Sequence, residues 1–358
     1  MNPLFGNAYT GRHVLVTGHT GFKGSWLCLW LTTLGAKVTG LALTPDTEPA
    51  HWNLLDLTGV HDLRVDLRDR QAIARSLAQI QPEIVFHLAA QPLVRRSYRE
   101  PIVTFDTNVL GLAHLLEAVR STSSVRALIN ATTDKVYLEQ PTDSGYREDH
   151  PLGGHDPYST SKACAELVTE CYRKSFFVGS GPRVATARAG NVIGGGDWSE
   201  DRLVPDLVRA AASGAVLQIR NPDAVRPWQH VLEPLSGYLL LGQALLAGDA
   251  VEGPWNFGPA SDATLPVRTL VAQMEAHWPG LRSEQLVAPH PHEAHTLKLD
   301  CSKAAKELAW WPVWNAEETL LRTVQWYRAY YEHGELRSND DLREYVAAAR
   351  AAGLEWAA

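Results

Sequence analysis

The sequence predicts an α/β fold: a doubly wound parallel sheet with helices on both faces, joined to a smaller mixed α/β domain. Short β-rich runs alternate with longer runs of helical periodicity as far as Arg188, which indicates parallel strands joined by helices. The alternation stops after that residue, at a glycine-rich loop. The chain has 358 residues, more than the ~250–300 at which a single core stops growing, and this favours two units.

The first unit contains six expected strands and the helices between them. Residues 13–17 form the first strand, bounded by Gly11 and Gly18, and residues 21–34 carry apolar side chains close to helical spacing. A later strand, at 83–88, is entered through Pro82. The other expected strands are 38–43, 61–65, 126–130 and 183–188, and the other expected helices are 104–120 and 163–172.

The chain returns to the first unit after the glycine-rich loop. Residues 229–246 have the pattern of a further helix, and residues 254–257 that of a further strand. We therefore expect the first unit to comprise residues 1–188 together with 228–257. The second unit then comprises residues 189–227 and 258–358.

Composition excludes several classes of protein. Hydrophobic residues make up 45% and charged residues 20%, which excludes a disordered or collagen-like chain. With 33 Lys+Arg against 40 Asp+Glu, the net charge of −7 argues against nucleic acid as a partner. The four cysteines have no zinc-like spacing, no signal peptide is recognisable, and the longest apolar run, near 239–246, falls short of the ~20 residues of a membrane span. We expect a cytoplasmic protein that binds neither nucleic acid nor membrane.

The turn after the first strand carries a GxxGxxG spacing at Gly18, Gly21 and Gly24. Glycines allow the backbone to turn sharply and to approach a pyrophosphate, whose charge then lies at the N-terminus of the following helix. With a strand before it and a helix after it, this spacing is typical of a dinucleotide-binding Rossmann sheet. A tight turn without a ligand is the alternative.

Residues near the second and third strands bear on which dinucleotide binds. The acidic residue expected about 20 positions after the glycines is replaced by Thr44, with Asp46 close behind. No Lys or Arg lies between Lys37 and Arg64, so a 2′-phosphate would find no cation there, which favours NAD over NADP. Asp66 is placed to meet the adenine edge, and a helix N-cap is the alternative.

Tyr158 and Lys162 place a phenol and an ammonium one helical turn apart on the same face. A nearby lysine cation lowers the pKa of a tyrosine, and the phenolate can then take a proton from an alcohol. Thr133, Asp134 and Lys135 follow the fifth strand, whose carboxyl end faces the same cleft. The alternatives are a solvated helix face for the pair, a capped turn for the Thr-Thr-Asp run and a surface charge for the lysine.

Seven segments carry these motifs and extend them almost from end to end of the chain. They are TGHTGFKGSWL (17–27), HLAAQPLVRRSY (87–98), TTDKVY (132–137), DPYSTSKACAEL (156–167), RAGNVIGGGDW (188–198), RPWQHVLEPLSGYL (226–239) and PHEAHTLKLDCSKA (291–304). Together they resemble the nucleotide-sugar branch of the extended short-chain dehydrogenase/reductases, and within it the CDP-glucose 4,6-dehydratases. The Asp134-Lys135 pair is the most specific feature, because thymidine-linked dehydratases carry Asp-Glu there.

The resemblance implies a redox-neutral loss of water from CDP-glucose, with NAD kept bound between turnovers. It implies that Tyr158 takes the proton of the 4-hydroxyl, held by Thr133, while hydride leaves C4. A base then removes the C5 proton, Asp134 protonates the departing 6-hydroxyl, and hydride returns to C6. Our hypothesis is that Lys135 is the C5 base or holds the enolate. Acting as the base requires a neutral amine, through desolvation or a neighbouring cation.

The resemblance also assigns binding residues and domain roles. The first unit becomes the NAD-binding Rossmann domain, and the second the nucleotide-sugar-binding domain. The expected cofactor contacts are Gly18, Thr20, Gly21, Phe22, Lys23, Gly24, Asp66, Leu67, Ala89, Ala90, Asn108, Tyr158 and Lys162. The expected substrate contacts are Gln91, Asn191, Arg202, Arg220, Arg226 and His292. Arg226 is the first choice for the diphosphate, and a surface salt bridge is the alternative for each arginine.

A cluster of histidines near the C-terminal third invites a metal-site interpretation. His290, His292, Glu293 and His295 lie close in the sequence, but their spacing is not HExxH and the resembled chemistry uses no metal. We expect no metal. A substrate-loop role is favoured, with a structural role next.

The family resemblance also bears on the oligomeric state and on the competing functions. The family resemblance implies a homodimer, with a four-helix interface built from the helices near 104–120 and 158–172, and a tetramer is the alternative. A dehydratase for another nucleotide sugar and a 4-epimerase are the competing enzymes. A non-catalytic NAD sensor is the alternative from another class, but it would not need Tyr158, Lys162, Thr133 and Asp134.

Overall fold

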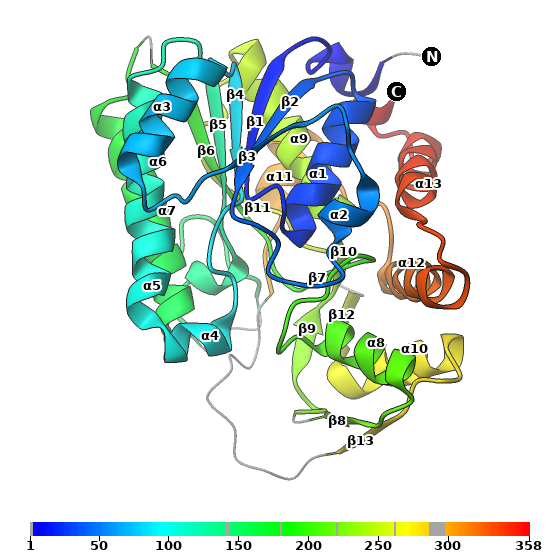
Figure 1. Cartoon of the computed structure of the whole chain (residues 1–358). Helices are drawn as coiled ribbons and strands as arrows, with labels where there is room; N and C mark the ends of the chain where they lie inside the picture. The colour runs from blue at the N-terminus through cyan, green and yellow to red at the C-terminus, as the bar shows by residue number, and fades with distance from the viewer. Residues whose placement is uncertain (1–2, 141–143, 180, 220, 261–262, 286–297) are drawn as a thin grey trace.

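The computed structural model describes residues 3–140, 144–179, 181–219, 221–260, 263–285 and 298–358. Its centre is a sheet of seven strands: β1 (His13–Thr17), β2 (Lys37–Ala42), β3 (His61–Arg64), β4 (Ile84–His87), β5 (Ala127–Ala131), β6 (Arg183–Arg188) and β11 (Gly253–Asn256). All neighbours are parallel, in the order β11-β6-β5-β4-β1-β2-β3 (Figure 1). The expected doubly wound parallel sheet is therefore confirmed.

Helices cover both faces of this sheet (Figure 1). One face packs against α3 (Arg70–Ile80), α6 (Gly111–Arg120) and α7 (Pro157–Ser175), and the other against α1 (Phe22–Thr33) and α9 (Leu232–Ala247). Successive residues of a strand serve opposite faces, so Leu15 belongs to the first layer while Val14 and Val16 belong to the second. Burial on both faces explains why the strands have continuous apolar sequences.

The smaller region follows β6, and its described residues form two helices and three two-stranded ribbons. The ribbons pair β7 (Val192–Ile193) with β10 (Gln229–His230), β8 (Leu217–Ile219) with β13 (Ser283–Gln285), and β9 (Val225–Pro227) with β12 (Thr264–Pro266). The helices are α8 (Leu203–Ser213) and α10 (Val267–His277). Between these segments the chain returns to the sheet, where β11 pairs with β6. The sheet and the smaller region are therefore interleaved in sequence.

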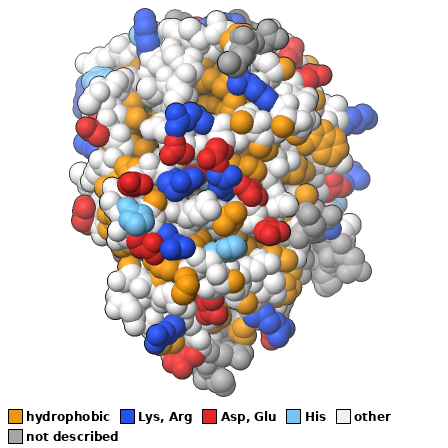
Figure 2. Space-filling model, turned by 90° about the vertical axis from the view of Figure 1, so that its right-hand side faces the viewer, with side chains coloured by type: hydrophobic (Ala, Val, Ile, Leu, Met, Phe, Trp, Pro, Cys, Tyr) orange, Lys and Arg blue, Asp and Glu red, His pale blue; other side chains and the backbone are white. Residues whose placement is uncertain are grey.

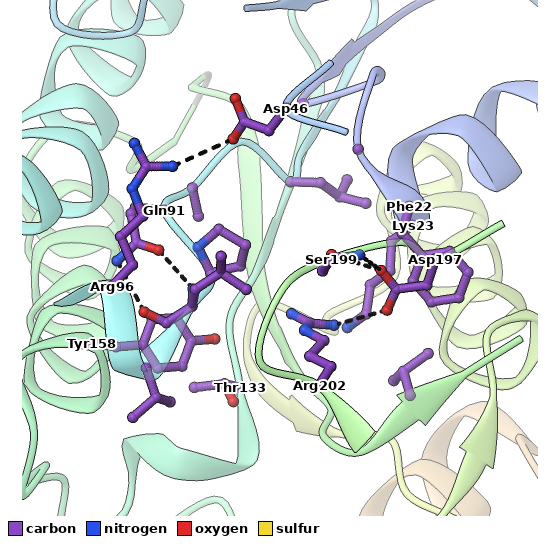
Figure 3. Close-up of a pocket in the computed structure, with 18 of the residues that line it drawn as sticks. Phe22, Lys23, Asp46, Gln91, Arg96, Thr133, Tyr158, Asp197, Ser199 and Arg202 are labelled. Atoms are coloured by element: carbon purple, nitrogen blue, oxygen red, sulfur yellow. Dashed lines mark hydrogen bonds and ion pairs between the residues drawn. The ribbon is translucent and has the colours of Figure 1, made fainter. Parts of the chain in front are cut away.

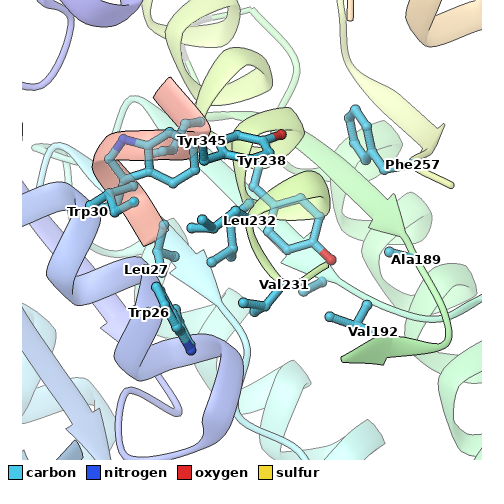
Figure 4. Close-up of a cluster of buried hydrophobic side chains, with 14 of the residues drawn as sticks. Trp26, Leu27, Trp30, Ala189, Val192, Val231, Leu232, Tyr238, Phe257 and Tyr345 are labelled. Atoms are coloured by element: carbon cyan, nitrogen blue, oxygen red, sulfur yellow. The ribbon is translucent and has the colours of Figure 1, made fainter. Parts of the chain in front are cut away.

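Aromatic side chains near the C-terminus pack against the first helix of the sheet and against the N-terminal residues. The last helices are α11 (Ser302–Leu308), α12 (Ala316–Arg328) and α13 (Ser338–Ala351). Tyr345 on α13 lies against Trp30 of α1 (Figure 4), with ring centroids 5.8 Å apart. Trp356 stacks on Phe5 with ring centroids 4.9 Å apart. We expected all of residues 258–358 in the second unit. Helix α13 and the residues after it pack against α1 and the N-terminal residues, whereas α12 also packs against α10 of the smaller region, so the boundary between the two units stays a prediction.

Two helices begin earlier than the sequence pattern suggested. The helix expected at 104–120 starts with α5 (Pro101–Phe105) and continues through a π-helical turn at Asp106–Leu110 into α6. The helix expected at 163–172 is part of α7, which the Asp156 side chain caps by accepting from the Ser159 N–H at 2.9 Å. Proline fits the first turn of both helices, because its missing N–H would have no partner there.

One helical run of the described residues is long and apolar enough to cross a membrane by length and composition. It is Pro101–Arg120, a run that the sequence inspection did not single out, and 44% of it is buried inside this fold. Its leucines at 112, 115 and 116 belong to the core layer shared with α3 and α7. A helix that packs in a protein core can have the same length and apolar composition as a membrane span.

The remaining helices are α2 (His51–Leu55) and α4 (Val94–Arg99), which lie beside the carboxyl ends of the strands. The face on the side of α12 and α13 mixes acidic and basic side chains, with no broad field of one sign (Figure 2). Its ion pairs include Arg328 with Glu332 and Arg322 with Glu318. Such interspersed pairs are typical of a solvated surface.

Candidate active site

A cavity of about 1000 Å³ opens at the carboxyl ends of the central strands, between the sheet and the smaller region. Ligands of open α/β sheets bind at this edge. Tyr158 and Thr133 lie on one wall, and Lys23, Asp197 and Arg202 lie on the opposite one (Figure 3). Every expected site residue that the structure describes lines this cavity, except Asn108, while Arg220 and His292 lie outside the described residues.

The glycine turn after β1 has the close backbone contacts that its motif predicted. Gly18 has a φ of +75°, and a Cβ there would lie 2.6 Å from the Ala89 nitrogen. A Cβ on Gly24 would lie 2.1 Å from the Gly18 oxygen, so a side chain fits at neither position. Among the described residues no side chain caps the N-terminus of α1 at Gly21, which leaves its N–H groups available to an anion at the cavity wall. This turn fits a dinucleotide pyrophosphate.

Asp66 lies on the cavity wall after β3 and is held by a neighbouring arginine. Its carboxylate accepts from the Arg68 backbone N–H at 2.9 Å and from the guanidinium Nε at 3.0 Å. The hydrogen bonds from Arg68 lower the pKa of Asp66. The N-cap alternative for Asp66 is wrong, because the Asp69 side chain caps α3 by accepting from the Ala72 N–H at 2.9 Å.

The expectation that no cation lies near the end of β2 is also wrong. Arg64 Nη1 donates to the Leu43 oxygen at 2.9 Å, because β3 lies beside β2 in the sheet. Arg96 reaches the same end from α4, with Nη1 3.6 Å from Asp46 Oδ2 (Figure 3). The absence of Lys and Arg between Lys37 and Arg64 in the sequence therefore does not favour NAD over NADP.

Lys23 extends from the first turn of α1 toward Arg202 (Figure 3). Burial, together with the charges of Arg202 and Lys162, lowers its pKa to about 7. Within the described part of the chain no hydrogen bond or ion pair of its ammonium is recorded. A cation held in a cavity among other cations is suited to an anionic ligand.

Tyr158 and Lys162 lie on the face of α7 that meets the end of β5. Burial raises the pKa of Tyr158 to about 12, against a hydrogen bond with Thr133 that lowers it. We expected Lys162 to lower this pKa. Lys162 Nζ instead donates to the Ala131 oxygen at 3.1 Å, and burial lowers the pKa of the lysine itself to about 8. At pH 7 the protein therefore encloses a neutral Tyr158 phenol beside a Lys162 amine that is still mostly protonated.

Asp134 is almost completely buried, with 1% of its side chain exposed, and donors surround it. Its Oδ1 accepts from Thr133 Oγ1 at 2.9 Å and faces Lys135 Nζ at 3.4 Å, while Oδ2 accepts from Asn191 Nδ2 at 3.0 Å. A Cβ on Gly190 would lie 1.8 Å from Oδ2, so this position requires glycine. Sequence reasoning missed Gly190, although it stands beside Asn191 in the RAGNVIGGGDW segment.

Lys135 has neither feature expected of a neutral base. Its side chain is 26% exposed, and its recorded ion-pair partner is the Asp134 carboxylate rather than a cation. The lysine is therefore partly solvated and paired with an anion. Its amine nevertheless lies on the cavity wall beside the acid.

Three expected ligand contacts serve the protein's own framework. Asn191 binds the Asp134 carboxylate, where we expected it to contact the diphosphate. The Gln91 amide donates to Thr104 Oγ1 at 2.9 Å and accepts from the Leu93 N–H at 2.7 Å. Asn108 is buried behind the cavity, where its Oδ1 accepts from the Gln91 N–H at 2.8 Å and its Nδ2 donates to Ser161 Oγ at 2.9 Å. These amides satisfy buried backbone groups, which propensity alone does not predict.

Two arginines of the smaller region reach the cavity. Arg202 Nη1 lies 3.4 Å from Asp197 Oδ2, and 35% of its side chain is exposed. Arg226 is 8% exposed, and its Nη1 donates to the Val225 oxygen at 3.0 Å. Sequence reasoning missed Asp197, which its neighbour Trp198 in the quoted segment could have indicated.

A metal centre finds no support in the described part of the chain. There, no group of three His, Cys, Asp or Glu side chains is placed to hold an ion. His290, His292, Glu293 and His295 lie outside the described residues. The titratable side chains that line the cavity include the phenol, the amines, the carboxylates and the guanidinium groups named above.

Known proteins share both the sequence and the fold of this chain. A curated CDP-glucose 4,6-dehydratase from Salmonella typhimurium is 47% identical over 352 residues, which cover 96% of this chain and 98% of that protein. The UDP-glucose 4-epimerase of Thermus thermophilus, solved in complex with NAD, has a TM-score of 0.76 and 28% identity over 88% of this chain and 98% of that one. DesIV, a dTDP-glucose 4,6-dehydratase from Streptomyces venezuelae solved with NAD, has a TM-score of 0.74 and 27% identity over 88% and 96%.

A family profile gives the same result independently of any single relative. The profile described as GDP-mannose 4,6 dehydratase matches residues 15–323, which span the sheet, the cavity and most of the smaller region. The motifs after β1 and β5, and at the start of α7, all fall inside this match. The chain therefore belongs to the GDP-mannose 4,6-dehydratase family of the extended short-chain dehydrogenase/reductases.

Proposed function

We propose that this protein is a NAD-dependent CDP-glucose 4,6-dehydratase, which converts CDP-D-glucose to CDP-4-keto-6-deoxy-D-glucose and water. The observation that carries this proposal is the 47% identity to a curated CDP-glucose 4,6-dehydratase across 96% of the chain. The cavity supports it chemically, because Thr133 on its wall is hydrogen-bonded to both Asp134 and Tyr158. The other relatives named above act on sugars linked to other nucleotides.

The glycine turn and the end of β4 are the proposed cofactor site. Gly18, Gly21 and Gly24 would receive the pyrophosphate at the N-terminus of α1. Bound NAD⁺ supplies the acceptor for the C4 hydride and, once reduced, the hydride that C6 receives. The proposed contacts also include Thr20, Phe22, Lys23, Asp66, Leu67, Ala89, Ala90, Tyr158 and Lys162, which all line the cavity.

Tyr158 is the proposed base for the sugar 4-hydroxyl. Its hydroxyl is hydrogen-bonded to Thr133, which can hold that substrate hydroxyl in line. Lys162, with a pKa of about 8, is protonated at neutral pH and can stabilise the phenolate that forms. These residues would remove the hydroxyl proton as the hydride leaves C4.

Asp134 and Lys135 are the proposed elimination pair. A ketone at C4 acidifies the C5–H, whose proton a base removes while the C6–O bond breaks. The departing oxygen takes a proton from Asp134 and leaves as water. Lys135 either takes the C5 proton or holds the charge of the enolate. After hydride addition at C6, a proton returns to C5, so the sugar loses one water and no net electrons.

Arginines of the smaller region are proposed to hold the diphosphate. Arg202 and Arg226 line the cavity, Arg202 on the wall across from Tyr158 (Figure 3), and guanidinium groups bind phosphate oxygens with bidentate geometry. Arg220 and His292 are further proposed contacts. Gln91, which lines the cavity, is another. Asn191 is better assigned to orienting Asp134, given their 3.0 Å hydrogen bond.

The direct test incubates the purified protein with CDP-glucose and follows the alkaline ultraviolet absorbance of a 4-keto-6-deoxy sugar. Parallel incubations with TDP-, UDP- and GDP-glucose test which nucleotide base the enzyme accepts. We expect turnover with the cytidine sugar, at a kcat/KM at least tenfold above each other nucleotide. Turnover confined to another nucleotide, or an epimer formed without loss of water, would refute the proposal. The Asp134-Lys135 pair disfavours the epimerase, because epimerisation at C4 needs no acid beside the 6-hydroxyl.

The role of Lys135 can be resolved with two substitutions that differ in charge. Lys135→Met removes both the base and the cation, whereas Lys135→Arg keeps a cation that cannot act as a base. Solvent deuterium exchange at C5 is the readout. If both variants lose the exchange at C5, Lys135 is the base. If only Lys135→Met loses it, Lys135 holds the charge of the enolate. Undiminished exchange in Lys135→Met would remove Lys135 from this step.

A cytoplasmic homodimer is the proposed form of the protein. Ile102 and Leu110, on the run from α5 into α6, are 71% and 53% exposed, and Leu167 on α7 is 58% exposed. These helices lie side by side on one flank of the sheet (Figure 1). Pairing two copies through them would bury these apolar side chains in a four-helix interface.

A further inference from the structure

A buried ion pair lies behind the segment that carries Thr133, Asp134 and Lys135. It joins Glu166 on α7 to Arg188 at the end of β6, with Arg188 Nη2 2.9 Å from Glu166 Oε2. Only 4% and 3% of these two side chains are exposed. Neither residue lines the cavity, so neither can contact the sugar or the cofactor there.

Glu166 holds the start of the segment. Its Oε1 accepts from the Thr132 hydroxyl and from Arg188 Nε at 3.1 Å, and its Oε2 also accepts from Thr186 Oγ1 at 2.7 Å. The carboxylate is therefore fully satisfied by buried donors, and one of them belongs to the residue before Thr133. Lys162, one turn earlier on the same helix, holds the adjacent Ala131 oxygen. The helix thus fixes two consecutive residues at the end of β5.

Arg188 holds the end of the same segment. Its Nη1 donates to the Tyr137 hydroxyl at 2.8 Å and to the Glu148 oxygen at 3.1 Å, and its guanidinium carbon lies 4.9 Å from the centre of the Tyr137 ring. The Tyr137 hydroxyl in turn donates to Asn256 Oδ1 at 2.7 Å on β11. Tyr137 follows the short helical turn that contains Asp134 and Lys135.

We infer that Glu166 and Arg188 form one positioning unit that holds residues 132–137 at both ends and thereby sets the geometry of Thr133, Asp134 and Lys135. The inference rests on the proposed dehydratase function, because the step it affects is the reaction at the sugar. The five catalytic side chains assigned above do not include either member of the pair. A turn held at one end only can shift, and a misplacement of about 1 Å can cost about 100-fold in rate.

A structural role alone makes a different prediction. A buried ion pair contributes little net stability, since desolvation offsets its attraction, and two apolar residues of similar volume often replace it without loss. The double variant Glu166→Met/Arg188→Met therefore separates the two roles. It leaves no unpaired buried charge, but it removes the contacts to Thr132 and Tyr137.

We expect the double variant to unfold within a few degrees of the wild type and to keep its KM for CDP-glucose within about threefold. Its kcat should fall about 100-fold, because the reacting groups lose their alignment while the substrate contacts remain. A kcat within threefold of the wild type would overturn the inference. Wild-type protein that does not act on CDP-glucose would refute the proposed function instead, and this result is seen before any variant is made.

Two single variants keep the inference testable if the double variant does not fold. Thr132→Val and Tyr137→Phe each remove one hydroxyl and leave the ion pair in place. Each should lower kcat about tenfold at an unchanged KM, and Thr132→Ser should restore the wild-type rate. Full activity in both hydroxyl-deleted variants would contradict the inference.

Glu233→Gln is the matched control for disturbing a buried carboxylate. Glu233 lies on α9, where it accepts from the Val313 and Trp314 N–H groups at 2.9 and 2.7 Å and from the Tyr345 hydroxyl at 2.8 Å. This network joins the C-terminal segment to the sheet and does not reach the cavity. Its loss should lower Tm while leaving kcat unchanged. An equal loss of kcat in Glu233→Gln would show that the rate reports general stability, which also contradicts the inference.

Discussion

Burial acts in opposite directions on the two titratable groups at the start of α7. It raises the pKa of Tyr158 to about 12 and lowers that of Lys162 to about 8, because the protein interior disfavours the charged form of each. The phenolate of Tyr158 is therefore disfavoured in the free protein, and the Lys162 ammonium is the neighbouring charge that can stabilise it when the tyrosine exchanges a proton with the sugar. This exchange is what reversible oxidation of a sugar hydroxyl requires.

Removing the phenol of Tyr158 tests this assignment. We expect Tyr158→Phe to lower kcat about 10²–10⁴-fold, the usual contribution of a general acid or base, with little change in the affinity for CDP-glucose. Steady-state kinetics and calorimetric titration provide the two measurements. Tyr238→Phe is the control, since Tyr238 is fully buried outside the cavity and its hydroxyl has no partner among the described residues. Equal losses in the two variants would contradict a special role for Tyr158.

Lys23 predicts a pH-dependent stability in the protein without ligands. Its pKa in the fold is about 7, against 10.5 for a free lysine, so the unfolded chain binds more protons between these values. The destabilisation is fully present below pH 7 and disappears as the pH rises to 10.5. Lys23→Met should therefore unfold about 2–4 °C above the wild type at pH 6, and the gap should narrow by pH 9.

Thermal unfolding at several pH values measures this effect. Lys37→Met is the control, because Lys37 is exposed on β2 and its substitution should change Tm little at any pH. A Lys23→Met gap that is constant from pH 6 to pH 9 would exclude burial of the charge as its cause.

Among the elements, strand ends were predictable and contacts between elements were not. The glycine turn, the end of β5 and the Tyr158–Lys162 face each occupy one short run of sequence, so local spacing revealed them. Arg64 and Arg96 reach the end of β2 from other elements. Asn191 likewise reaches Asp134 from the loop after β6, the strand beside β5. These contacts arise from sheet order and loop geometry, which no local pattern encodes.

Helix α13 predicts a second pH effect. Asp341 is fully buried, and among the described residues neither carboxylate oxygen has a hydrogen-bond partner, with Arg337 Nε 3.8 Å away. Burial raises its pKa to about 7 from 3.8, so the folded protein binds more protons in this interval and loses stability as the pH rises through it.

Asp341→Asn removes this charge at nearly constant volume. The variant should have a higher free energy of unfolding than the wild type, and this advantage should be about 1–3 kcal/mol larger at pH 8 than at pH 5. Urea denaturation at the two pH values measures the difference. The exposed neighbour Asp340 provides the control Asp340→Asn, for which we expect a similar, small effect at both pH values. A larger gain at pH 5 would contradict a buried ionised carboxylate.

The apolar flank of α5, α6 and α7 predicts the assembly. Ile102→Glu/Leu110→Glu places two charges on side chains that are 71% and 53% exposed in the monomer. We expect the molar mass from light scattering to halve, because charged residues in an apolar interface lose their hydration. Trp311→Glu is the control on another part of the surface, with 56% of that side chain exposed. A double variant that keeps the wild-type mass would place the interface elsewhere.

For the molecule as a whole, local charge matters more than the net charge of −7. The cavity gathers Lys23, Lys162, Arg202 and Arg226 from α1, α7 and the smaller region. Acidic residues such as Asp134 and Asp197 line the same cavity, so any attraction for an anionic nucleotide is local to these four cations. The interleaved chain brings these cations together, since β11 and α9 return to the sheet between segments of the smaller region.

The central claim is a transfer of hydrogen from C4 to C6 of one CDP-glucose molecule with loss of water. CDP-glucose carrying deuterium at C4, incubated with the enzyme and analysed by mass spectrometry and NMR, tests it most directly. The account predicts CDP-4-keto-6-deoxyglucose with the deuterium retained at C6 and one solvent hydrogen at C5. Deuterium found at C4 of an epimer that has lost no water would contradict it.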